Sequence, residues 1–277
     1  MLTKARRSLG LRKIDLFARE AVVVPPYTVS ALIYDQMMRE VDYRSWSKYL
    51  LKLMRLASPQ FLPSRMRGKR VCELACGTGN LSEILSDTGL NMTGIDMSSD
   101  MINAATSKQK KNARPGPRYV NDDMTSYRSP ERFDGAICVY DSINYLPTRN
   151  SLKKFFGSVY ANLNYGGVFV FDASLESNSL GDASNFEQRG RFKGIVYQRQ
   201  SSYDRDSKVH TTYVRVAIDG EVSEEIHREH VYSMTVLRTL FGQAGFVERF
   251  AAGDFTLSEA DDRSDRVHFV LVRPGHD

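Results

Sequence analysis

The sequence predicts an α/β protein whose core is a doubly wound, mostly parallel sheet. A short apolar run at residues 70–74 leads into a turn with two glycines and then into a helical pattern. Strand-like and helix-like segments alternate from there to residue 172, as they do in successive βαβ units. After residue 190, apolar and polar residues alternate with a period of two, which predicts an antiparallel β meander inserted after the fifth strand.

The bulk composition is that of an ordinary globular protein. The chain has 277 residues, of which 42% are hydrophobic and 26% are charged, and this is enough for one large domain. The net charge is +5, and part of the excess lies near the N-terminus at Lys4, Arg6, Arg7, Arg12 and Lys13. Such an arm could contact nucleic acid or an anionic membrane, but a solvated helix face is the simpler interpretation. No apolar run is long enough to cross a bilayer, so we expect no membrane association.

The cysteines indicate a reducing compartment. Three cysteines cannot form a fully paired disulfide framework. Cys72 and Cys138 lie in apolar runs and Cys76 lies in the glycine turn, which is typical of small buried thiols. Cys72 and Cys76 are poorly spaced for zinc, and no nearby ligand completes a site. Because residues 11–15 are also too charged for an export signal, we expect a cytoplasmic protein without a bound metal.

The segment before the sheet is expected to be helical. Apolar residues recur at helical spacing over residues 34–57 and predict one or two amphipathic helices interrupted near Asp42. Ser58-Pro59 should end them, because a residue before proline disfavours helical geometry. Pro25-Pro26 marks an earlier break.

Five strands and the helices between them make up the predicted parallel core. The strands are expected at residues 70–74, 92–95, 118–121, 135–140 and 168–172. Helices should follow the glycine turn, start at Ser98 or Ser99 as an N-cap, and run from Ser151 to the Gly166-Gly167 turn.

The C-terminal third is expected to add two kinds of antiparallel strand. Three alternating runs form the meander, and Asp219-Gly220 is a strong hairpin signal between the last two. A helix that ends at Gly245 and two edge strands complete the core sheet, while a mobile loop precedes the meander. The ranges are 191–200, 209–218 and 221–231 for the runs, 247–252 and 267–272 for the edge strands, and 174–190 for the loop. We therefore expect one domain with a helical lid at 1–60, a core at 61–185 and 233–277, and a β insertion at 186–232.

The turn after the first strand has the chemistry of an anion site. Gly77 and Gly79 let the backbone turn sharply and approach a ligand, and the following helix start offers free N–H groups. Asp96 lies 19 positions after Gly77 (96 − 77), at the end of the second strand, where an acid can bind ribose hydroxyls. A helix-capping role is the alternative for Asp96. A dinucleotide site would place a third glycine at Ser82 and would not call for Glu73, so another adenosine ligand is favoured.

At this point the chain resembles the class I S-adenosylmethionine-dependent methyltransferases. Five segments are similar to that family's motifs in its order: residues 73–79, 94–98, 122–124, 134–140 and 163–168. The resemblance covers residues 70–172 well and the last helix and two strands more loosely. It implies a Rossmann-like sheet of seven strands in the order 3-2-1-4-5-7-6, with S-adenosylmethionine as the cofactor. Ala75 departs from the family, because many members have glycine there.

The resemblance also implies roles for individual residues. The glycine turn would hold the methionine part, Glu73 would orient that turn, Asp96 would hold the ribose, and Asp123 with Met124 would flank the adenine. The implied cofactor residues are Tyr34, Trp46, Glu73, Ala75, Gly77, Gly79, Asp96, Met97, Asp123, Met124 and Tyr140. For Met97 and Met124, ordinary core packing is the alternative.

A narrower resemblance suggests the kind of acceptor. Tyr34-Asp35 and residues 42–46 are similar to the N-terminal lid of small-molecule methyltransferases, including amino-sugar N-methyltransferases, and residues 141–146 are similar to their substrate-facing loop. DNA and RNA amine methyltransferases usually carry an Asn/Asp-Pro-Pro-Tyr loop after the fourth strand, which this chain lacks. Pro25-Pro26-Tyr27 is preceded by Val24 instead of a polar residue, so we discount it. A nucleic-acid base is therefore disfavoured as the acceptor.

A general base is needed only if the nucleophile arrives protonated. Asp141, Tyr145, His227 and His230 are the candidates, and Tyr145 is favoured for orienting the acceptor. His227 and His230 have opposite parity on one strand, so at most one should face the site.

Several functions remain open at this stage. We expect transfer of a methyl group to an N or O nucleophile of a small molecule, by a protein that could form a homodimer. The alternatives are a methyltransferase that acts on RNA or protein, and a non-catalytic regulator that binds S-adenosylmethionine. An NAD-dependent oxidoreductase is disfavoured by Ser82 and Glu73.

Overall fold

The core of the molecule is a seven-stranded mixed sheet. The computed structural model describes residues 15–112, 116–181 and 186–275, so the basic residues between Lys4 and Lys13 lie outside the described residues. The sheet order is β11-β12-β6-β5-β2-β3-β4, and β12 is antiparallel to both of its neighbours while the other pairs are parallel. Counted along the chain, this is the order 3-2-1-4-5-7-6 that the family resemblance implied. The strands are β2 (Arg70–Leu74), β3 (Asn91–Asp96), β4 (Arg118–Asn121), β5 (Phe133–Cys138), β6 (Leu163–Ser174), β11 (Val247–Gly253) and β12 (Arg266–Val272).

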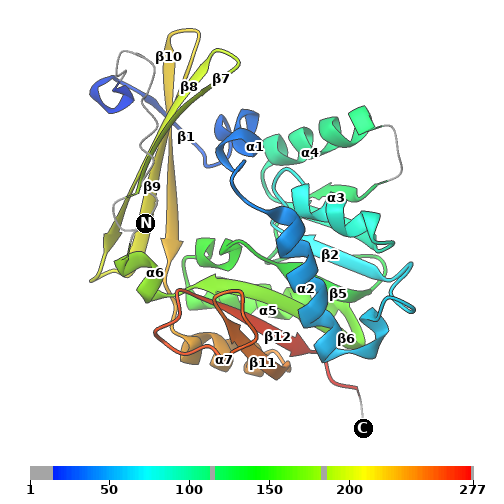
Figure 1. Ribbon diagram of the computed structural model, residues 1–277. Coiled ribbons are helices and arrows are strands. Elements are labelled where there is room, and N and C mark those ends of the chain that lie inside the picture. The colour runs from blue at the N-terminus through cyan, green and yellow to red at the C-terminus, as the bar shows by residue number, and fades with distance from the viewer. Residues whose placement is uncertain (1–14, 113–115, 182–185, 276–277) are drawn as a thin grey trace, which may run out of the picture.

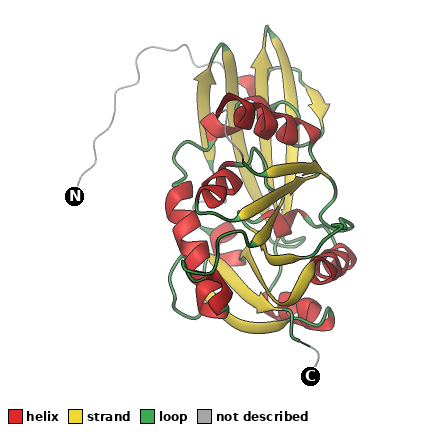
Figure 2. Cartoon of the chain, turned by 90° about the vertical axis from the view of Figure 1, so that its right-hand side faces the viewer, coloured by secondary structure: helices red, strands yellow, loops and turns green. Residues whose placement is uncertain are grey.

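Helices cover both faces of this sheet, as Figure 2 shows. On one face, aromatic side chains of α5 and α7 pack against Phe169 and Phe171 of β6 and Phe269 of β12. On the other face, Leu50 and Leu53 of α2 and the apolar side of α3 pack against β2, β5 and β6. Burying each such side chain contributes roughly 1.5–3 kcal/mol, so the two layers hold the strand ends in place. The helices of the core are α2 (Tyr43–Ala57), α3 (Asn80–Asp87), α4 (Ser99–Asn112), α5 (Arg149–Asn162) and α7 (Met234–Gln243).

The N-terminal helices are divided where the sequence predicted. Asp42 caps α2 by accepting a hydrogen bond from the Ser45 N–H at 3.0 Å, and the short α1 (Tyr34–Met37) precedes it. The helix α2 ends at Ser58, and the 3-10 turn η3 (Pro59–Phe61) follows. Two further 3-10 turns, η1 (Leu16–Ala18) and η2 (Ser30–Leu32), lie before α1. None of the described helices combines the length and the apolar character needed to cross a membrane.

A second sheet stands beside the core, at the upper left of Figure 1. Its order is β1-β10-β9-β8-β7, with antiparallel pairs from β7 to β10 and with β1 parallel to β10. The strand β1, which the sequence reading missed, is only three residues long. The strands are β1 (Val22–Val24), β7 (Glu187–Phe192), β8 (Ile195–Asp204), β9 (Val209–Ile218) and β10 (Glu221–His230).

The meander has one more hairpin than predicted. The expected strand at 191–200 is wrong, because the chain reverses at Lys193 and Gly194, whose φ angles are 48° and 87°. Both central residues of this two-residue turn are left-handed, and Lys-Gly is a weaker signal for such a turn than Asn-Gly. The predicted hairpin at Asp219-Gly220 is present between β9 and β10. The loop expected at 174–190 instead contains α6 (Glu176–Leu180) and the start of β7.

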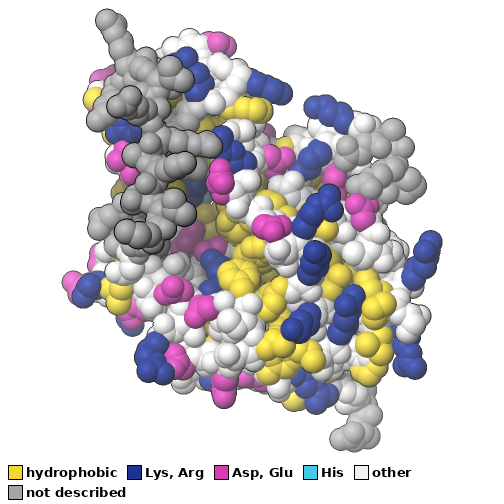
Figure 3. Space-filling model, in the orientation of Figure 1, with side chains coloured by type: hydrophobic (Ala, Val, Ile, Leu, Met, Phe, Trp, Pro, Cys, Tyr) yellow, Lys and Arg dark blue, Asp and Glu magenta, His cyan; other side chains and the backbone are white. Residues whose placement is uncertain are grey.

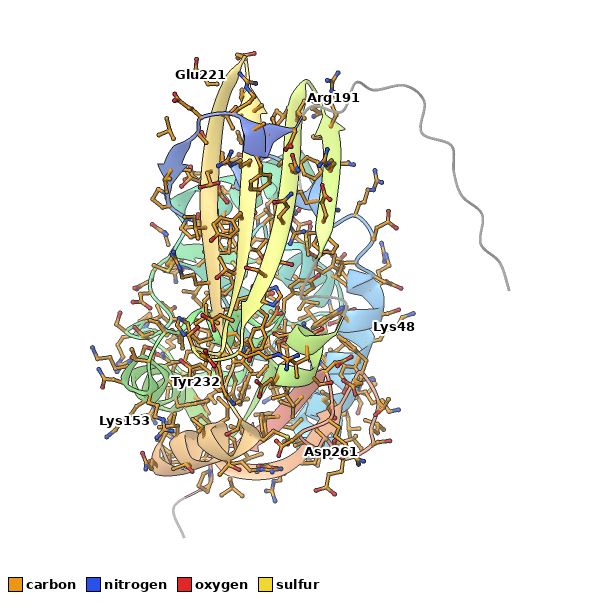
Figure 4. The ribbon with its side chains drawn as sticks, turned by 90° about the vertical axis from the view of Figure 1, so that its left-hand side faces the viewer. Lys48, Lys153, Arg191, Glu221, Tyr232 and Asp261 are labelled. Atoms are coloured by element: carbon orange, nitrogen blue, oxygen red, sulfur yellow. The ribbon has the colours of Figure 1, made fainter. Side chains whose placement is uncertain are left out.

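The meander is joined to the core at one end only. Figure 4 shows Arg191 and Glu221 at the far turns of the meander, and Tyr232 at the opposite end, where the chain re-enters the core. The N-terminal segment fills part of the space between the two sheets: Ile33 and Met37 pack against Val214 and Val216 on the inner face of the meander. This packing forms the wall of a cavity.

Candidate functional site

A cavity of about 1280 Å³ lies between the two sheets. In Figure 3 the surface is hollowed between the five-stranded sheet and the core. The cavity floor is formed by residues that follow β2, β3 and β5, at the point where the strand order reverses between β2 and β5. Open α/β sheets bind ligands at this position. Pockets for one small ligand measure roughly 300–1,000 Å³, so this cavity has room for more than one.

The glycine turn lies at the edge of the floor. Gly77 and Gly79 are left-handed, with φ angles of 54° and 75°. A Cβ on Gly79 would lie 2.2 Å from the hydroxyl of Tyr119, so glycine is required there, whereas a Cβ on Gly77 would meet no atom within 4 Å. Ala75, at φ 56°, lines the cavity in a backbone conformation that favours glycine. The open space beside Gly77 lets a ligand approach the backbone closely.

Asp96 holds the glycine turn against the end of β3. Its Oδ2 accepts a hydrogen bond from the Gly77 N–H at 2.8 Å, and its Oδ1 accepts one from the Ser98 N–H at 2.9 Å. Burial raises the pKa of Asp96, although these two N–H groups oppose the shift. Asp96 lines the cavity, and Ser98 rather than Asp96 caps α4 through Met101 N–H. The carboxylate therefore combines a fixed position with access to a ligand.

Two of the implied cofactor residues lie behind the cavity wall. Glu73 is buried and accepts a hydrogen bond from the Ser82 hydroxyl, so it fastens the first turn of α3 and does not line the cavity. Burial raises the pKa of Glu73 to about 8. The ring of Trp46 packs behind the ring of Tyr140, with the two centroids 5.4 Å apart, and Tyr140 does line the cavity. Gly77 and Gly79 are likewise outside the lining.

The adenine-side residues differ in their packing. Met124 packs against the hydrophobic core and also lines the cavity, so its core packing is compatible with the predicted cofactor role. Met97 is 76% exposed and lines the cavity without being part of the core, which removes core packing as an explanation for it. Asp123 accepts a hydrogen bond from the Thr125 N–H at 2.8 Å and also lines the cavity.

Asp35 ties α1 to the glycine turn. Its Oδ1 accepts hydrogen bonds from the Thr78 hydroxyl at 2.6 Å and the Asn80 amide at 2.8 Å, and Lys108 lies 3.1 Å from its Oδ2. Burial alone would raise the pKa of Asp35, but the Thr78 hydrogen bond and the Lys108 charge outweigh it and lower that pKa. Tyr34, the neighbouring residue, is thereby held on the cavity wall.

The inner face of the meander forms the opposite wall. Glu225, His227 and Glu229 share one face of β10, and the two neighbouring strands add polar side chains beside them. His227 lines the cavity and His230 does not, as their opposite parity predicted. The polar lining residues of β8 and β9 are Arg199, Ser201, His210 and Thr212.

A chain of hydrogen bonds connects the N-terminal segment to this wall. The Tyr27 hydroxyl lies 2.6 Å from the Tyr145 hydroxyl, which lies 3.0 Å from Nδ1 of His227. Nε2 of His227 lies 3.0 Å from Oε2 of the fully buried Glu225. Sequence reasoning proposed Tyr145 and His227 but missed Tyr27, Glu225 and Glu229. Shared parity with His227 could have pointed to the two glutamates.

Asp141, Glu229 and Tyr145 of the cavity lining are in different states. Asp141, whose φ is 52°, lines the cavity, but its carboxylate lies 3.1 Å from Arg266, which also binds the buried Asp172. Burial raises the pKa of Glu229 to about 8, and the Asp141 charge adds to this shift. Burial also raises the pKa of Tyr145, so this phenol keeps its proton at neutral pH. Asp141 is thus already paired, while Glu229 can gain or lose a proton near neutrality.

Within the described residues, no group of three or more His, Cys, Asp or Glu side chains is arranged to hold a metal ion.

Proteins named as methyltransferases are similar to this chain in sequence. Residues 71–167 match the family model described as "Methyltransferase domain". The chain is 27% identical over 249 residues to the Bacillus subtilis protein YqeM, which is named as a methyltransferase, and the match covers 88% of this chain and 95% of that one. It is 23% identical over 222 residues to a Streptomyces venezuelae dTDP-3-amino-3,4,6-trideoxy-alpha-D-glucopyranose N,N-dimethyltransferase, covering 79% and 87% of the two chains.

Solved structures with the same fold cover nearly the whole molecule. An S-adenosylmethionine-dependent methyltransferase from Clostridium acetobutylicum superposes with a TM-score of 0.73 at 24% identity and covers 90% of this chain and 99% of its own. The sugar N-methyltransferase KedS8 from Streptoalloteichus superposes with a TM-score of 0.70 at 18% identity and covers 99% of both chains.

Proposed function

The protein is a class I S-adenosylmethionine-dependent methyltransferase, and we propose that it methylates an N or O nucleophile of a small polar molecule. The cavity with two unlike walls is the observation that carries the proposal. One wall carries Asp96 at a strand end, with the glycine turn beside it, and the other carries hydrogen-bonding side chains of the meander. We assign the cofactor to the first wall and the acceptor to the second.

The first wall suits S-adenosylmethionine, which supplies a methyl group already activated on a sulfonium. The open space at Gly77 and the fixed carboxylate of Asp96 fit the methionine and ribose parts. Met97, Asp123 and Met124 would enclose the adenine. Tyr34, Ala75 and Tyr140 would complete the wall, and Glu73 and Trp46 would support it from behind.

The second wall suits a polar acceptor. Five of its side chains can donate or accept hydrogen bonds: Ser201, His210, Thr212, His227 and Glu229. An apolar acceptor would form no hydrogen bonds with this polar surface, whereas a polar acceptor can bond to it. The Streptomyces venezuelae relative named for an amino-sugar substrate and the sugar N-methyltransferase KedS8 support this class of acceptor.

Positioning supplies most of the catalysis in this scheme. The walls hold the nucleophile in line with the methyl group, and the segment over residues 25–38 covers the cavity as a lid. Tyr145 orients the nucleophile through its hydroxyl. If the nucleophile carries a proton to be lost, Tyr145 receives it while passing its own proton to Nδ1 of His227, and Glu225 stabilises the resulting imidazolium. Asp141 acts as part of the wall, because Arg266 occupies its carboxylate.

A screen with labelled methyl donor tests the function directly. Amines and hydroxyl compounds, amino sugars included, are incubated with the protein, and label should reach at least one of them. For an acceptor whose nucleophile must lose a proton, Tyr145→Phe should lower turnover at least about 100-fold, because positioned proton transfer contributes roughly 10²–10⁴-fold. The affinity for S-adenosylhomocysteine, measured by calorimetry, should change less than about threefold.

Tyr203→Phe is the matched control and should leave turnover unchanged, because the Tyr203 hydroxyl donates to Glu176 at 2.9 Å and neither residue lines the cavity. Tight S-adenosylhomocysteine binding with no transfer to any small molecule would instead indicate a regulator. Label found only in RNA or protein would indicate a macromolecular acceptor.

A further inference from the structure

We propose that Glu225 is a positioning residue that couples closure of the N-terminal strap, defined as residues 25–30, to the tautomer of His227. The inference rests on the proposed function, because it gives the strap and His227 parts in one reaction. It goes beyond that function by naming what assembles the acceptor wall. The strap itself lines the cavity with Pro25, Pro26, Tyr27, Thr28 and Ser30.

Glu225 is the point on which the strap closes. Its Oε1 accepts hydrogen bonds from the N–H groups of Val29 at 2.7 Å and Ser30 at 2.8 Å. Its Oε2 accepts from the Tyr27 N–H at 3.0 Å and the Ser30 hydroxyl at 2.6 Å, and it lies 3.0 Å from Nε2 of His227. The side chain is completely buried. One carboxylate thus satisfies three backbone N–H groups of the strap and one imidazole.

This arrangement requires an ionised carboxylate. Among the described residues no Lys or Arg forms an ion pair with Glu225, so its charge is balanced by hydrogen bonds alone. A buried carboxylate without such donors would cost several kcal/mol. Burial by itself would raise the pKa of Glu225, but the hydrogen bonds from His227 and Ser30 outweigh burial and hold that pKa below its usual value. If the strap left, Glu225 would lose most of its donors at once.

The ionised carboxylate also sets the direction of the hydrogen-bond chain. Because Oε2 can only accept, Nε2 of His227 carries the proton and Nδ1 presents its lone pair to Tyr145. Nδ1 of His227 is therefore an acceptor for the Tyr145 O–H, with Glu229 as the other acceptor beside it, and the Tyr145 oxygen accepts from Tyr27 at 2.6 Å. Tyr27 of the strap is present at both ends of this hydrogen-bond chain. Its hydroxyl bonds to Tyr145 at one end, and its N–H bonds to Glu225 at the other.

The strap is held in a conformation that it would not adopt alone. Tyr27 has a φ of 63°, in the left-handed region that costs a non-glycine residue roughly 1–2 kcal/mol. Its ring packs edge-on against His227, with the centroids 4.7 Å apart, and its carbonyl accepts a hydrogen bond from the Ser98 hydroxyl. Without Glu225 the strap can relax, and the wall then loses Tyr27 and the fixed tautomer together.

Glu225→Gln tests the coupling, because it turns one accepting oxygen into a donating NH₂ group of similar size. If the NH₂ group faces His227, the imidazole must place its proton on Nδ1, and if it faces Val29 and Ser30, their N–H groups lose their acceptor. We expect ¹⁵N NMR to show loss of a pure Nε2–H tautomer at His227, or amide exchange at Val29 and Ser30 that rises at least tenfold. Turnover should fall at least tenfold in either case. Retention of both the Nε2–H tautomer and wild-type exchange would overturn the proposal.

Two variants separate this coupling from a general loss of structure. Ser30→Ala removes one strap donor and keeps the carboxylate, so exchange at Tyr27 and Val29 should rise about threefold to tenfold while the His227 tautomer stays unchanged. This variant also carries the test if Glu225→Gln does not fold, and unchanged exchange at both positions would then overturn the proposal. Glu221→Gln, an exposed change at the far turn of the same strand, should affect neither readout.

The spectroscopic and exchange readouts need no acceptor. A methyl-transfer screen without any product would therefore contradict the proposed function and leave the coupling proposal unaffected. Normal methyl transfer by Glu225→Gln, with an unchanged His227 tautomer and unchanged amide exchange, would contradict only the coupling proposal.

Discussion

The two walls of the cavity are held in place by different kinds of interaction. The cofactor wall uses backbone N–H groups and one acid, all between Gly77 and Ser98, in turns that end neighbouring parallel strands. The acceptor wall uses side chains that meet across the chain: Ser30 and Glu225, for example, are 195 positions apart. The first wall therefore depends on how the sheet positions its own turns, and the second depends on each polar group finding its partner. Substitutions in the acceptor wall should therefore disturb function more than folding. Substitutions at the junction, defined as the ion pairs of Arg266 with Asp141 and Asp172, should disturb both.

Arg266 lies at this junction, and its loss should have the largest effect. Its side chain is 16% exposed and bridges Asp141 of the cavity wall and the fully buried Asp172. Arg266→Met would leave two carboxylates close together without a cation, and breaking a buried pair costs about 3–5 kcal/mol. We expect the free energy of unfolding in urea to fall by that amount.

Arg263→Met is the control for this experiment. Arg263 pairs with Asp261 but is 91% exposed, so its loss should leave the free energy of unfolding nearly unchanged. Equal losses for the two variants would show that the junction has no special importance.

Asp96 tests the cofactor wall alone. Asp96→Ala removes the carboxylate that we propose binds the ribose, and it also leaves the Gly77 N–H without its acceptor. Hydrogen bonds to a charged group contribute roughly 1.5–3 kcal/mol each, so S-adenosylhomocysteine affinity should fall about 100-fold by calorimetry. Asp96→Asn keeps the volume and one accepting oxygen and should lose about tenfold. Affinity within threefold of wild type for both variants would remove Asp96 from the cofactor site.

Glu73 should give an effect that appears as a pH dependence of stability. Burial raises the pKa of Glu73 to about 8, whereas the unfolded chain releases this proton near pH 4.3. Between these values the folded state binds more protons, so its contribution to stability is complete below about pH 4.3 and is lost as the pH rises to 8. The slope is at most about 1.4 kcal/mol per pH unit.

Glu73→Gln should flatten the pH dependence of unfolding in this window, because the amide does not titrate. Glu229 contributes in the same range, so the comparison is the difference between wild type and variant at each pH. Glu221→Gln, at an exposed position, measures the effect of the amide substitution itself. Parallel curves for Glu73→Gln and wild type would contradict the raised pKa.

Local signals account for the parts of the fold that were predicted correctly. The strands β2 and β4 have the predicted bounds, Asp42 divides the N-terminal helices, and the hairpin at Asp219-Gly220 is present. Each depends on residues close together in the chain, where periodicity and turn chemistry act directly. The hairpin at Lys193-Gly194 was missed because Lys-Gly is a weak turn signal. The strand β1 was missed because three residues are too few to show a periodicity, although its valines favour a strand, and pairing with β10 stabilises it.

By itself, the sequence predicted the wall that we propose for the cofactor: the glycine turn, Asp96 and the segment from Asp122 to Met124 are contiguous motifs at strand ends. Tertiary structure alone decided that Glu73 and Trp46 lie behind that wall, that Arg266 occupies Asp141, and that Tyr27 and Glu225 complete the chain through Tyr145 and His227. The physical reason is the range of the interaction. A backbone turn is specified by its own residues, whereas a buried carboxylate takes its role from donors that only the folded chain brings to it.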